Sequence, residues 1–175
     1  MKKFKLTSEF IVDISGVKLF RIKALIEFGN VKAGDLGGYI EKEENLSHMG
    51  DAWVSGDARV SGNAWVSGNA RVFGNAQVSG NARVSGNARV FSDAQVSGDA
   101  RVSGDKDYAY AHGFGSCNRT TTFFRLKDGD VGVRCGCFYG TLAQFRDKVC
   151  ETHGETKKAQ EYLMLADLME IRFKN

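Results

Sequence analysis

The segment 112–122 holds the densest set of groups in the chain that could bind an anion. Its glycines allow backbone N–H groups to approach a ligand closely, and its hydroxyls and guanidinium can bind the oxygens of a phosphate. The candidate ligand-binding residues are His112, Ser116, Arg119, Thr120 and Thr122. Because alternate residues of a strand face opposite sides, we expect Thr120 and Thr122 to act together while Thr121 is buried. The alternative is a plain loop that enters a threonine-rich edge strand, since motifs this loose give many false matches.

A second group of side chains has the chemistry of a zinc site. Cys135 and Cys137 are two residues apart, as on one side of a strand, and Cys150 and His153 lie about one turn apart, as on one side of a helix. Four such ligands can hold zinc tetrahedrally. The spacing is looser than that of a zinc knuckle, and free thiols with a cationic histidine at a helix end explain the same residues. We therefore expect no metal and no cofactor, with zinc as the alternative.

A sequence repeat precedes these groups and should form the elements that position them. From Gly50 to Ser103, nine six-residue units follow one another without an insertion, and eight of the nine open with Gly, Ser92 being the exception. The second slot is always Asp or Asn, the third Ala and the fifth Val. Gly followed by Asn or Asp suits a corner, and the next residues suit an extended side with Ala and Val inward. Three sides close a triangular coil, so the repeat predicts three stacked coils with a dry interior and no room for a ligand.

The unit Val-Ser-Gly-Asn-Ala-Arg resembles the hexapeptide repeat of left-handed β-helix proteins, the group that includes bacterial hexapeptide acyltransferases. The stretches 31–34, 37–40 and 45–47 are similar to the entry segment of uncharacterised bacterial and phage members. Together these likenesses cover roughly residues 9–104. The resemblance implies left-handed coiling and a trimer about an axis parallel to the coils, whereas the fold by itself does not indicate a function.

Acyltransferases of this group use a histidine that projects from the helix to deprotonate the acceptor, and none of the nine units contains one. The coil is also unbroken by the loops that commonly build an acceptor pocket. His48 and His112 are the weak catalytic candidates, and a hydrogen-bonded edge histidine is the preferred interpretation of His48. We therefore predict no catalytic residue, and an acyltransferase with an acyl-CoA donor is the alternative.

Stacking the units sorts their outward side chains into columns. One side carries an aromatic and two arginines in one column, with Phe73 and Phe91 in the next. Exposing two outward phenylalanine rings to water is unfavourable, so another subunit or the C-terminal segment of the same chain should cover them. We favour a subunit interface. Its predicted residues are Trp53, Arg71, Phe73, Arg89 and Phe91.

The predicted fold is mainly β and has three parts: residues 1–49 as an N-terminal hairpin and cap, 50–104 as the β-helix, and 105–175 as a small α+β domain. Residues 9–14 and 17–27 are expected to form the hairpin, and 119–126 and 131–138 two later strands. A helix should begin at Thr141, where Thr-x-x-Gln forms a capping box, and end at Gly154. A second helix from about Glu155 should make this a ββαα unit that docks on the last coil or on a neighbour. Its expected buried residues are Ala159, Tyr162, Leu163, Ala166 and Met169.

Composition sets the remaining expectations. The chain has 175 residues and a net charge of only +3, and its coil arginines are interleaved with aspartates, so nucleic-acid binding is not favoured. With no long apolar run and no signal-like start, we expect a cytoplasmic protein, in the host cytoplasm if phage-encoded, with no membrane partner. The leading hypothesis is a non-catalytic, trimeric binding or scaffold protein. Its C-terminal unit would bind or sequester a host protein or a phosphorylated, nucleotide-like ligand.

Overall fold

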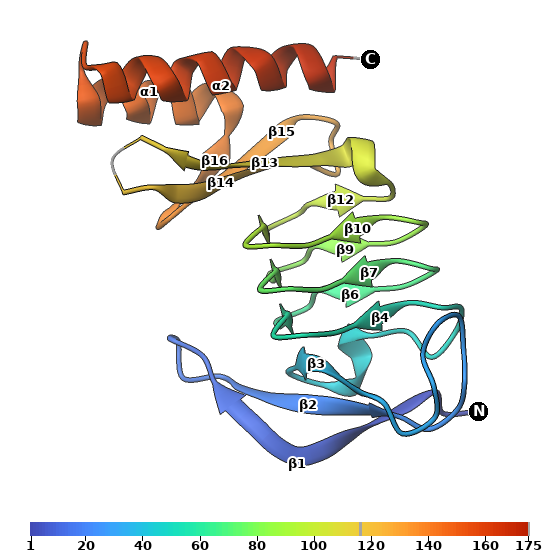
Figure 1. Ribbon diagram of the computed structural model, residues 1–175. Helices are drawn as coiled ribbons and strands as arrows, with labels where there is room; N and C mark the ends of the chain where they lie inside the picture. Colours follow the sequence, from blue (N-terminus) through green and yellow to red (C-terminus); the bar gives the residue numbers. More distant parts are fainter. Residues whose placement is uncertain (116, 175) are drawn as a thin grey trace.

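The computed structural model describes residues 1–115 and 117–174. Three parts follow one another along one axis: a β-hairpin, a stack of coils, and a sheet covered by two helices (Figure 1). The fold is mainly β, with a β-solenoid and two C-terminal helices. Among the described residues, none of the helices combines the length and hydropathy that a membrane span requires.

The N-terminal hairpin joins the solenoid edge to edge. Strands β1 (Phe4–Val12) and β2 (Lys18–Ala24) are antiparallel, and β2 pairs antiparallel with β3 (Leu36–Ile40). The first strand begins five residues earlier than the predicted 9–14. At this end of the stack the Lys3 ammonium is buried and donates hydrogen bonds to the carbonyls of Gly50, at 3.1 Å, and Ala52, at 2.8 Å. Backbone carbonyls that the stack leaves open at this end are thus satisfied by a side chain.

Nine two-residue strands form the regular coils, and parallel pairing stacks them into three walls. The strands are β4 (Trp53–Val54), β5 (Arg59–Val60), β6 (Trp65–Val66), β7 (Arg71–Val72), β8 (Gln77–Val78), β9 (Arg83–Val84), β10 (Arg89–Val90), β11 (Gln95–Val96) and β12 (Arg101–Val102). One wall also includes β3, since Ile40 pairs with Val60, and Leu46 bridges Val66 in another. The solenoid therefore has about four turns, not the three that the repeat predicts. The extra turn escapes the pattern because Ile40 and Leu46 fill the inward positions without an Ala-x-Val unit.

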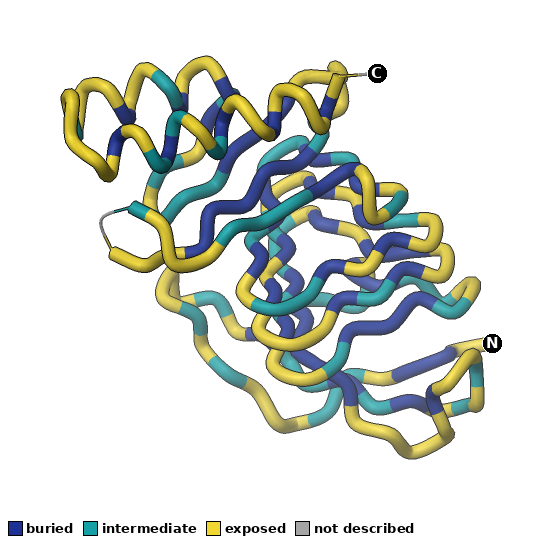
Figure 2. The backbone as a smooth tube through the Cα atoms, turned by 45° about the horizontal axis from the view of Figure 1, so that its top comes forward, coloured by how far each residue is buried: buried dark blue, intermediate teal, exposed yellow. Residues whose placement is uncertain are grey.

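Every repeat alanine and valine is buried, as the pattern predicts, with at most 1% of its surface exposed. Figure 2 shows buried stretches lining the inside of each coil, while the corners are exposed. The corner glycines have positive φ, and a Cβ on Gly80 would lie only 2.8 Å from the backbone nitrogen of Gly98 in the next coil. Ser92, the one exception, also has a positive φ of 56°. Corner glycine is therefore required both by conformation and by the close stacking of the coils.

The C-terminal part is a four-stranded antiparallel sheet with α1 and α2 on one face and the last coil on the other (Figure 1). Its elements are β13 (Tyr108–Phe114), β14 (Arg119–Arg125), β15 (Val131–Cys135), β16 (Phe138–Thr141), α1 (Leu142–His153) and α2 (Lys157–Phe173). The ββαα prediction thus missed β13 and β16. On β14, Phe123 packs into the core beneath the helices and Phe124 into the core of the solenoid. One strand therefore belongs to both hydrophobic cores.

The helix boundaries follow local capping chemistry. Thr141 caps α1 through the predicted capping box with Gln144, and Gly154, with φ 55°, ends the helix. The second helix begins at Lys157, two residues later than expected, because the hydroxyl of Thr156 accepts a hydrogen bond from the N–H of Ala159. Four of the five residues expected to be buried are buried; Leu163 is half-buried.

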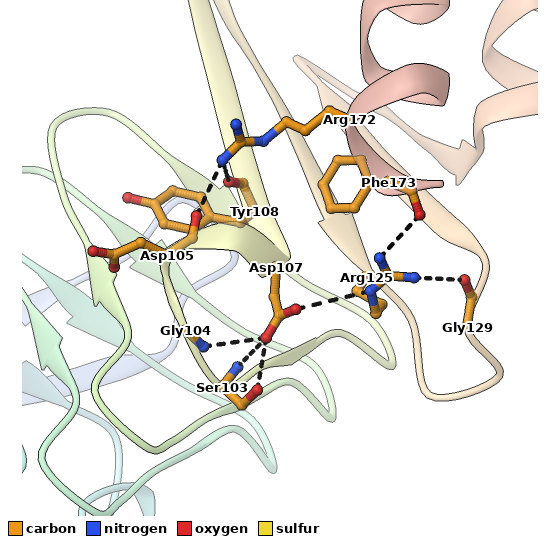
Figure 3. A network of polar contacts seen from close by, with 9 residues as sticks. All are labelled: Ser103, Gly104, Asp105, Asp107, Tyr108, Arg125, Gly129, Arg172 and Phe173. Carbon is orange, nitrogen blue, oxygen red and sulfur yellow. Dashed lines mark hydrogen bonds and ion pairs between the residues drawn. The ribbon is translucent and has the colours of Figure 1, made fainter. Parts of the chain in front are cut away.

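A polar network fixes the C-terminal part on the last coil of its own chain (Figure 3). The Asp107 carboxylate accepts hydrogen bonds from the N–H and hydroxyl of Ser103 and the N–H of Gly104, and it faces the Arg125 guanidinium at 3.8 Å. Arg125 also donates to the carbonyl of Phe173 at the end of α2. Burial alone would raise the pKa of Asp107, but these hydrogen bonds and Arg125 outweigh it and hold the pKa below its usual value.

Candidate functional site

A pocket of about 280 Å³ opens between the helix-facing side of the C-terminal sheet and helices α1 and α2. It is lined by Cys117, Arg119, Cys135, Cys137, Phe138, Phe145, Lys148, Val149, Thr152, His153 and Tyr162. These side chains come from β14 together with the loop before it, from the β15–β16 hairpin, from α1 and from α2. The fold therefore brings these four segments together at one place.

Aromatic rings line much of the pocket. Phe145 of α1 is one of them, and its ring lies 5.5 Å from that of Phe138 and 5.7 Å from that of Tyr162. Phe145 and Tyr162 are buried, so the helix packing holds their rings in place. The His153 ring stacks on Tyr162 at 5.8 Å, which extends the aromatic surface to the end of α1. Such a surface suits a flat or apolar ligand.

Two cationic side chains lie around these rings. Arg119 is exposed on β14, and its guanidinium makes no hydrogen bond or ion pair with any described residue. It lies so close to the backbone of Gly136 that a side chain there would collide with its Nη1 atom. Lys148 is paired with Glu151 at 2.8 Å, so its charge is partly balanced. Arg119 is therefore the cation that an anionic ligand would meet without a competing carboxylate.

The sheet separates the residues that the sequence grouped around Arg119. Arg119, Thr121 and Phe123 face the helices, whereas Thr120 and Thr122 face the opposite side. Thr122 is fully buried and accepts a hydrogen bond from the backbone N–H of Gln95 at 2.9 Å. The prediction that Thr122 binds a ligand is therefore wrong, because this hydroxyl closes the last coil.

The rest of that predicted anion site is also divided. Thr120 is buried, and its hydroxyl bonds to Nδ1 of the exposed His112 at 2.9 Å, away from the pocket. Thr121 is buried as expected, but all three threonines are. Ser116 lies outside the described residues. Of the described members of the predicted set, His112, Arg119, Thr120 and Thr122, the structure places only Arg119 in the pocket.

The predicted zinc ligands do not converge. Cys137 lies in the two-residue turn between β15 and β16, not on a strand with Cys135. Cys150 is exposed on α1 and does not line the pocket that contains His153 and the other two thiols. Within residues 1–115 and 117–174, no group of three or more histidine, cysteine, aspartate or glutamate side chains could hold a metal ion. The four-ligand arrangement is therefore wrong, because a turn and a helix face separate its members.

His48 has the environment of a structural histidine. Its Nδ1 accepts a hydrogen bond from the N–H of Lys3 at 3.1 Å, and its Nε2 lies 2.7 Å from the Glu43 carboxylate. The ring also stacks on Phe4 at 4.3 Å. Hydrogen bonds from Lys2 and from His48 lower the pKa of Glu43. Both ring nitrogens of His48 are thus engaged, which leaves neither for an acceptor substrate.

The face predicted as a subunit interface is partly covered by its own chain. Trp53 is buried, with the Phe28 ring 5.4 Å away, so it is not an outward contact residue. Phe73 and Phe91 stack at 5.3 Å, and Tyr110 of β13 covers Phe91 edge-on at 5.7 Å. Phe73 remains 36% exposed. It lines a hollow of about 370 Å³ with Trp53, Arg71, Arg89, Asn30 and Ser55.

Lys148, Phe138 and Thr152 line the pocket, but no sequence motif predicts them as site residues. Phe145, Lys148, Val149 and Thr152 share one face of α1 at helical spacing. The available signal is the presence of two polar residues, Lys148 and Thr152, on the same face as Phe145 and Val149.

Comparison with known proteins identifies the coils. Residues 52–68, 64–80, 76–91 and 94–105 match the family model described as the YdcK beta-solenoid repeat. No curated protein was found to match the chain. The repeat section is thus a β-solenoid by sequence comparison as well as by structure, and the match lies outside the residues of the pocket.

Proposed function

We propose that the chain is a non-catalytic binding protein whose C-terminal unit holds a small aromatic anion, phosphorylated or nucleotide-like, in the pocket beside Arg119. The observation that carries this proposal is a guanidinium that has no hydrogen-bond or ion-pair partner among the described residues and lies next to buried aromatic rings. A guanidinium binds phosphate or carboxylate with two parallel hydrogen bonds, and an aromatic wall stacks against a base or similar ring. The two features together match a ligand with a charged end and a flat end.

The size of the pocket limits the ligand. Its volume of about 280 Å³ lies just below the ~300–1,000 Å³ typical of small-molecule sites. A ligand of mononucleotide size or smaller is therefore favoured over a dinucleotide or an acyl-CoA. The engaged ring of His48 likewise gives no support to the acyltransferase alternative.

The proposal extends to assembly. Left-handed coils and a homotrimer, as the resemblance of the hexapeptide units implies, would make the solenoid a spacer that presents three C-terminal units. The exposed ring of Phe73 and the hollow beside Arg71 and Arg89 support an interface on this face. Solution mass tests it: we expect three chains per particle, and Phe73→Asp should give single chains. A monomeric wild-type protein would remove the trimer from the proposal.

Calorimetric titration with nucleoside monophosphates, the matching nucleosides and inorganic phosphate tests the ligand proposal. Arg119→Gln should weaken binding of the monophosphate about 10- to 100-fold, the loss expected for one charge-assisted hydrogen-bonded contact of about 1.5–3 kcal/mol. Arg134→Gln is the matched control, because Arg134 pairs with Thr122 on the neighbouring strand and faces away from the pocket. Failure of every anion to bind, or equal effects of the two substitutions, would refute the proposal.

A further inference from the structure

Three of the four cysteines of the chain line the pocket that holds Arg119. All are free thiols; Cys117 and Cys137 are exposed and Cys135 is half-buried. The fourth, Cys150, is exposed on α1 outside the pocket lining. Thiols gathered in one cavity can react with a molecule that the cavity binds, whereas Cys150 meets only molecules that diffuse freely to it.

The three pocket thiols differ in their surroundings. The Cys135 sulfur accepts a hydrogen bond from the Thr121 hydroxyl at 3.2 Å, and the Tyr162 hydroxyl lies 3.8 Å away. Its half-buried position under these groups restricts a backside approach to the sulfur. Cys137 lies in the exposed turn that follows Gly136, and the Arg119 guanidinium covers Gly136 directly. Cys117 is also exposed, in the loop before β14, but Cys137 is the exposed thiol whose neighbour in the chain, Gly136, lies against the Arg119 guanidinium.

Positive charge around this thiol selects among its possible reaction partners. Arg119 and Lys148 line the pocket, and within the part of the chain that the structure describes the only carboxylate that pairs with either of them is Glu151. A small disulfide that carries carboxylates is attracted to such a site, and a disulfide that carries ammonium groups is repelled. Thiol–disulfide exchange also requires that the attacking thiolate reach the disulfide in line with its S–S bond, which an exposed turn permits.

We propose that Cys137 is a site of exchange with the disulfide of a small anionic thiol of the glutathione type, an inference that rests on the proposed anion binding by Arg119. The Cys137 thiolate attacks one sulfur of the bound disulfide, and a bond forms between Sγ and that sulfur. The S–S bond of the small molecule breaks, and the second thiol leaves as a thiolate that takes a proton from water. No net oxidation occurs, because one disulfide is exchanged for another. The pocket then carries a covalently held anion.

The test compares oxidised glutathione with cystamine, a disulfide that carries two ammonium groups, at equal concentration on the reduced full-length protein. Peptide mapping by mass spectrometry gives the modification rate at each cysteine. We expect the ratio of glutathione to cystamine rates to be at least about tenfold higher at Cys137 than at Cys150, since one favourable charge contact is worth about that factor. Arg119→Gln should reduce this preference several-fold at Cys137 and leave Cys150 unchanged, with Arg134→Gln as control.

The outcomes separate this inference from the proposed function. Equal ratios at Cys137 and Cys150, first modification at Cys117 or Cys135, or a preference that survives Arg119→Gln would each overturn the exchange site. Titration of the reduced wild-type protein with a nucleoside monophosphate, which carries no disulfide, reports anion binding alone. If the reduced protein binds the monophosphate but shows no selective exchange, only the exchange inference fails. If neither occurs, both fail.

Discussion

Replacing Asp107 by alanine tests whether one buried carboxylate holds the C-terminal unit on the solenoid. Only 6% of Asp107 is exposed, and its carboxylate accepts three hydrogen bonds, at 2.7 Å from the Ser103 hydroxyl and at 2.9 and 3.1 Å from the N–H groups of Ser103 and Gly104. Asp107→Ala removes all three acceptors and the charge that faces Arg125. The two N–H groups at the end of the last coil then have no acceptor in the protein.

The expected loss in the free energy of unfolding is about 2–4 kcal/mol. A hydrogen bond to a charged group contributes about 1.5–3 kcal/mol, and an unsatisfied buried donor costs about 1–3 kcal/mol. The total is smaller than the sum of the three bonds, because water can enter beside Ser103 and because Arg125 keeps its bonds to the carbonyls of Gly129 and Phe173. The C-terminal unit should lose most of this stability, because the coils keep their own ladder of backbone hydrogen bonds.

Urea denaturation can follow the two parts separately. Both tryptophans, Trp53 and Trp65, lie in the solenoid, so fluorescence reports the coils, while helical circular dichroism reports α1 and α2. In Asp107→Ala the helical signal should be lost at lower urea than the fluorescence change. Asp147→Ala is the control, because Asp147 is exposed on α1 and has no hydrogen bond or ion pair with a described residue. If Asp107→Ala shifts neither transition beyond this control, the junction argument is wrong.

Three further predictions use the same denaturation assay. The pKa of Asp107 is lower in the folded state than its ordinary 3.8, so the advantage of wild type over Asp107→Asn should be full above about pH 4 and should shrink as pH falls through the folded-state value. Burial lowers the pKa of Lys3 to about 8 from its ordinary 10.5, so between these two pH values the unfolded chain binds more protons than the folded chain. The stability of wild type relative to Lys3→Met should therefore rise from pH 8 to pH 10.5. A stability difference that does not change with pH would contradict this. Val72→Ala should lower the free energy of unfolding by about 2–3 kcal/mol, because it removes buried apolar surface and leaves a cavity in the fully buried interior of the coils. A loss below about 1 kcal/mol would indicate a loosely packed interior.

The solenoid could be predicted in detail because the residue type at each position of the six-residue unit indicates the structural role of that position. Glycine marks the corner, and alanine and valine mark the two inward positions, nine times without an exception at the inward slots. The additional turn was missed because its inward positions have the same structural role as those of the repeat but are occupied by other residue types. Ile40 pairs with Val60 and Leu46 with Val66, yet neither belongs to an Ala-x-Val unit. A repeat search detects residue identity, whereas the physical requirement is only an inward apolar side chain.

The pocket could not be predicted from local pattern because both faces of the C-terminal sheet are covered. Alternation along β14 was anticipated correctly, and Thr120 and Thr122 do share a side. The sequence does not state that the coil lies on that side and the helices on the other. Because the last coil covers one face and the helices cover the other, Thr120 and Thr122 make structural hydrogen bonds, and Arg119 is the residue of these three that lines the pocket. The site thus depends on which element covers which face, and this is a tertiary property.

The same alternation ties the pocket to the solenoid. On one side of β14, Thr122 binds the N–H of Gln95 and Phe124 is buried in the solenoid core. On the other side, Phe123 packs under the helices and Arg119 lies beside the pocket rings. A shift of β14 toward a ligand would break the Gln95 bond and disturb a fully buried phenylalanine, so the strand is fixed before a ligand arrives. If the pocket binds the proposed anion, binding would require little ordering of the backbone, and the free energy of the Arg119 contact would be available for affinity. The proposed function would thus give the solenoid a role in recognition although none of the pocket-lining residues belongs to it.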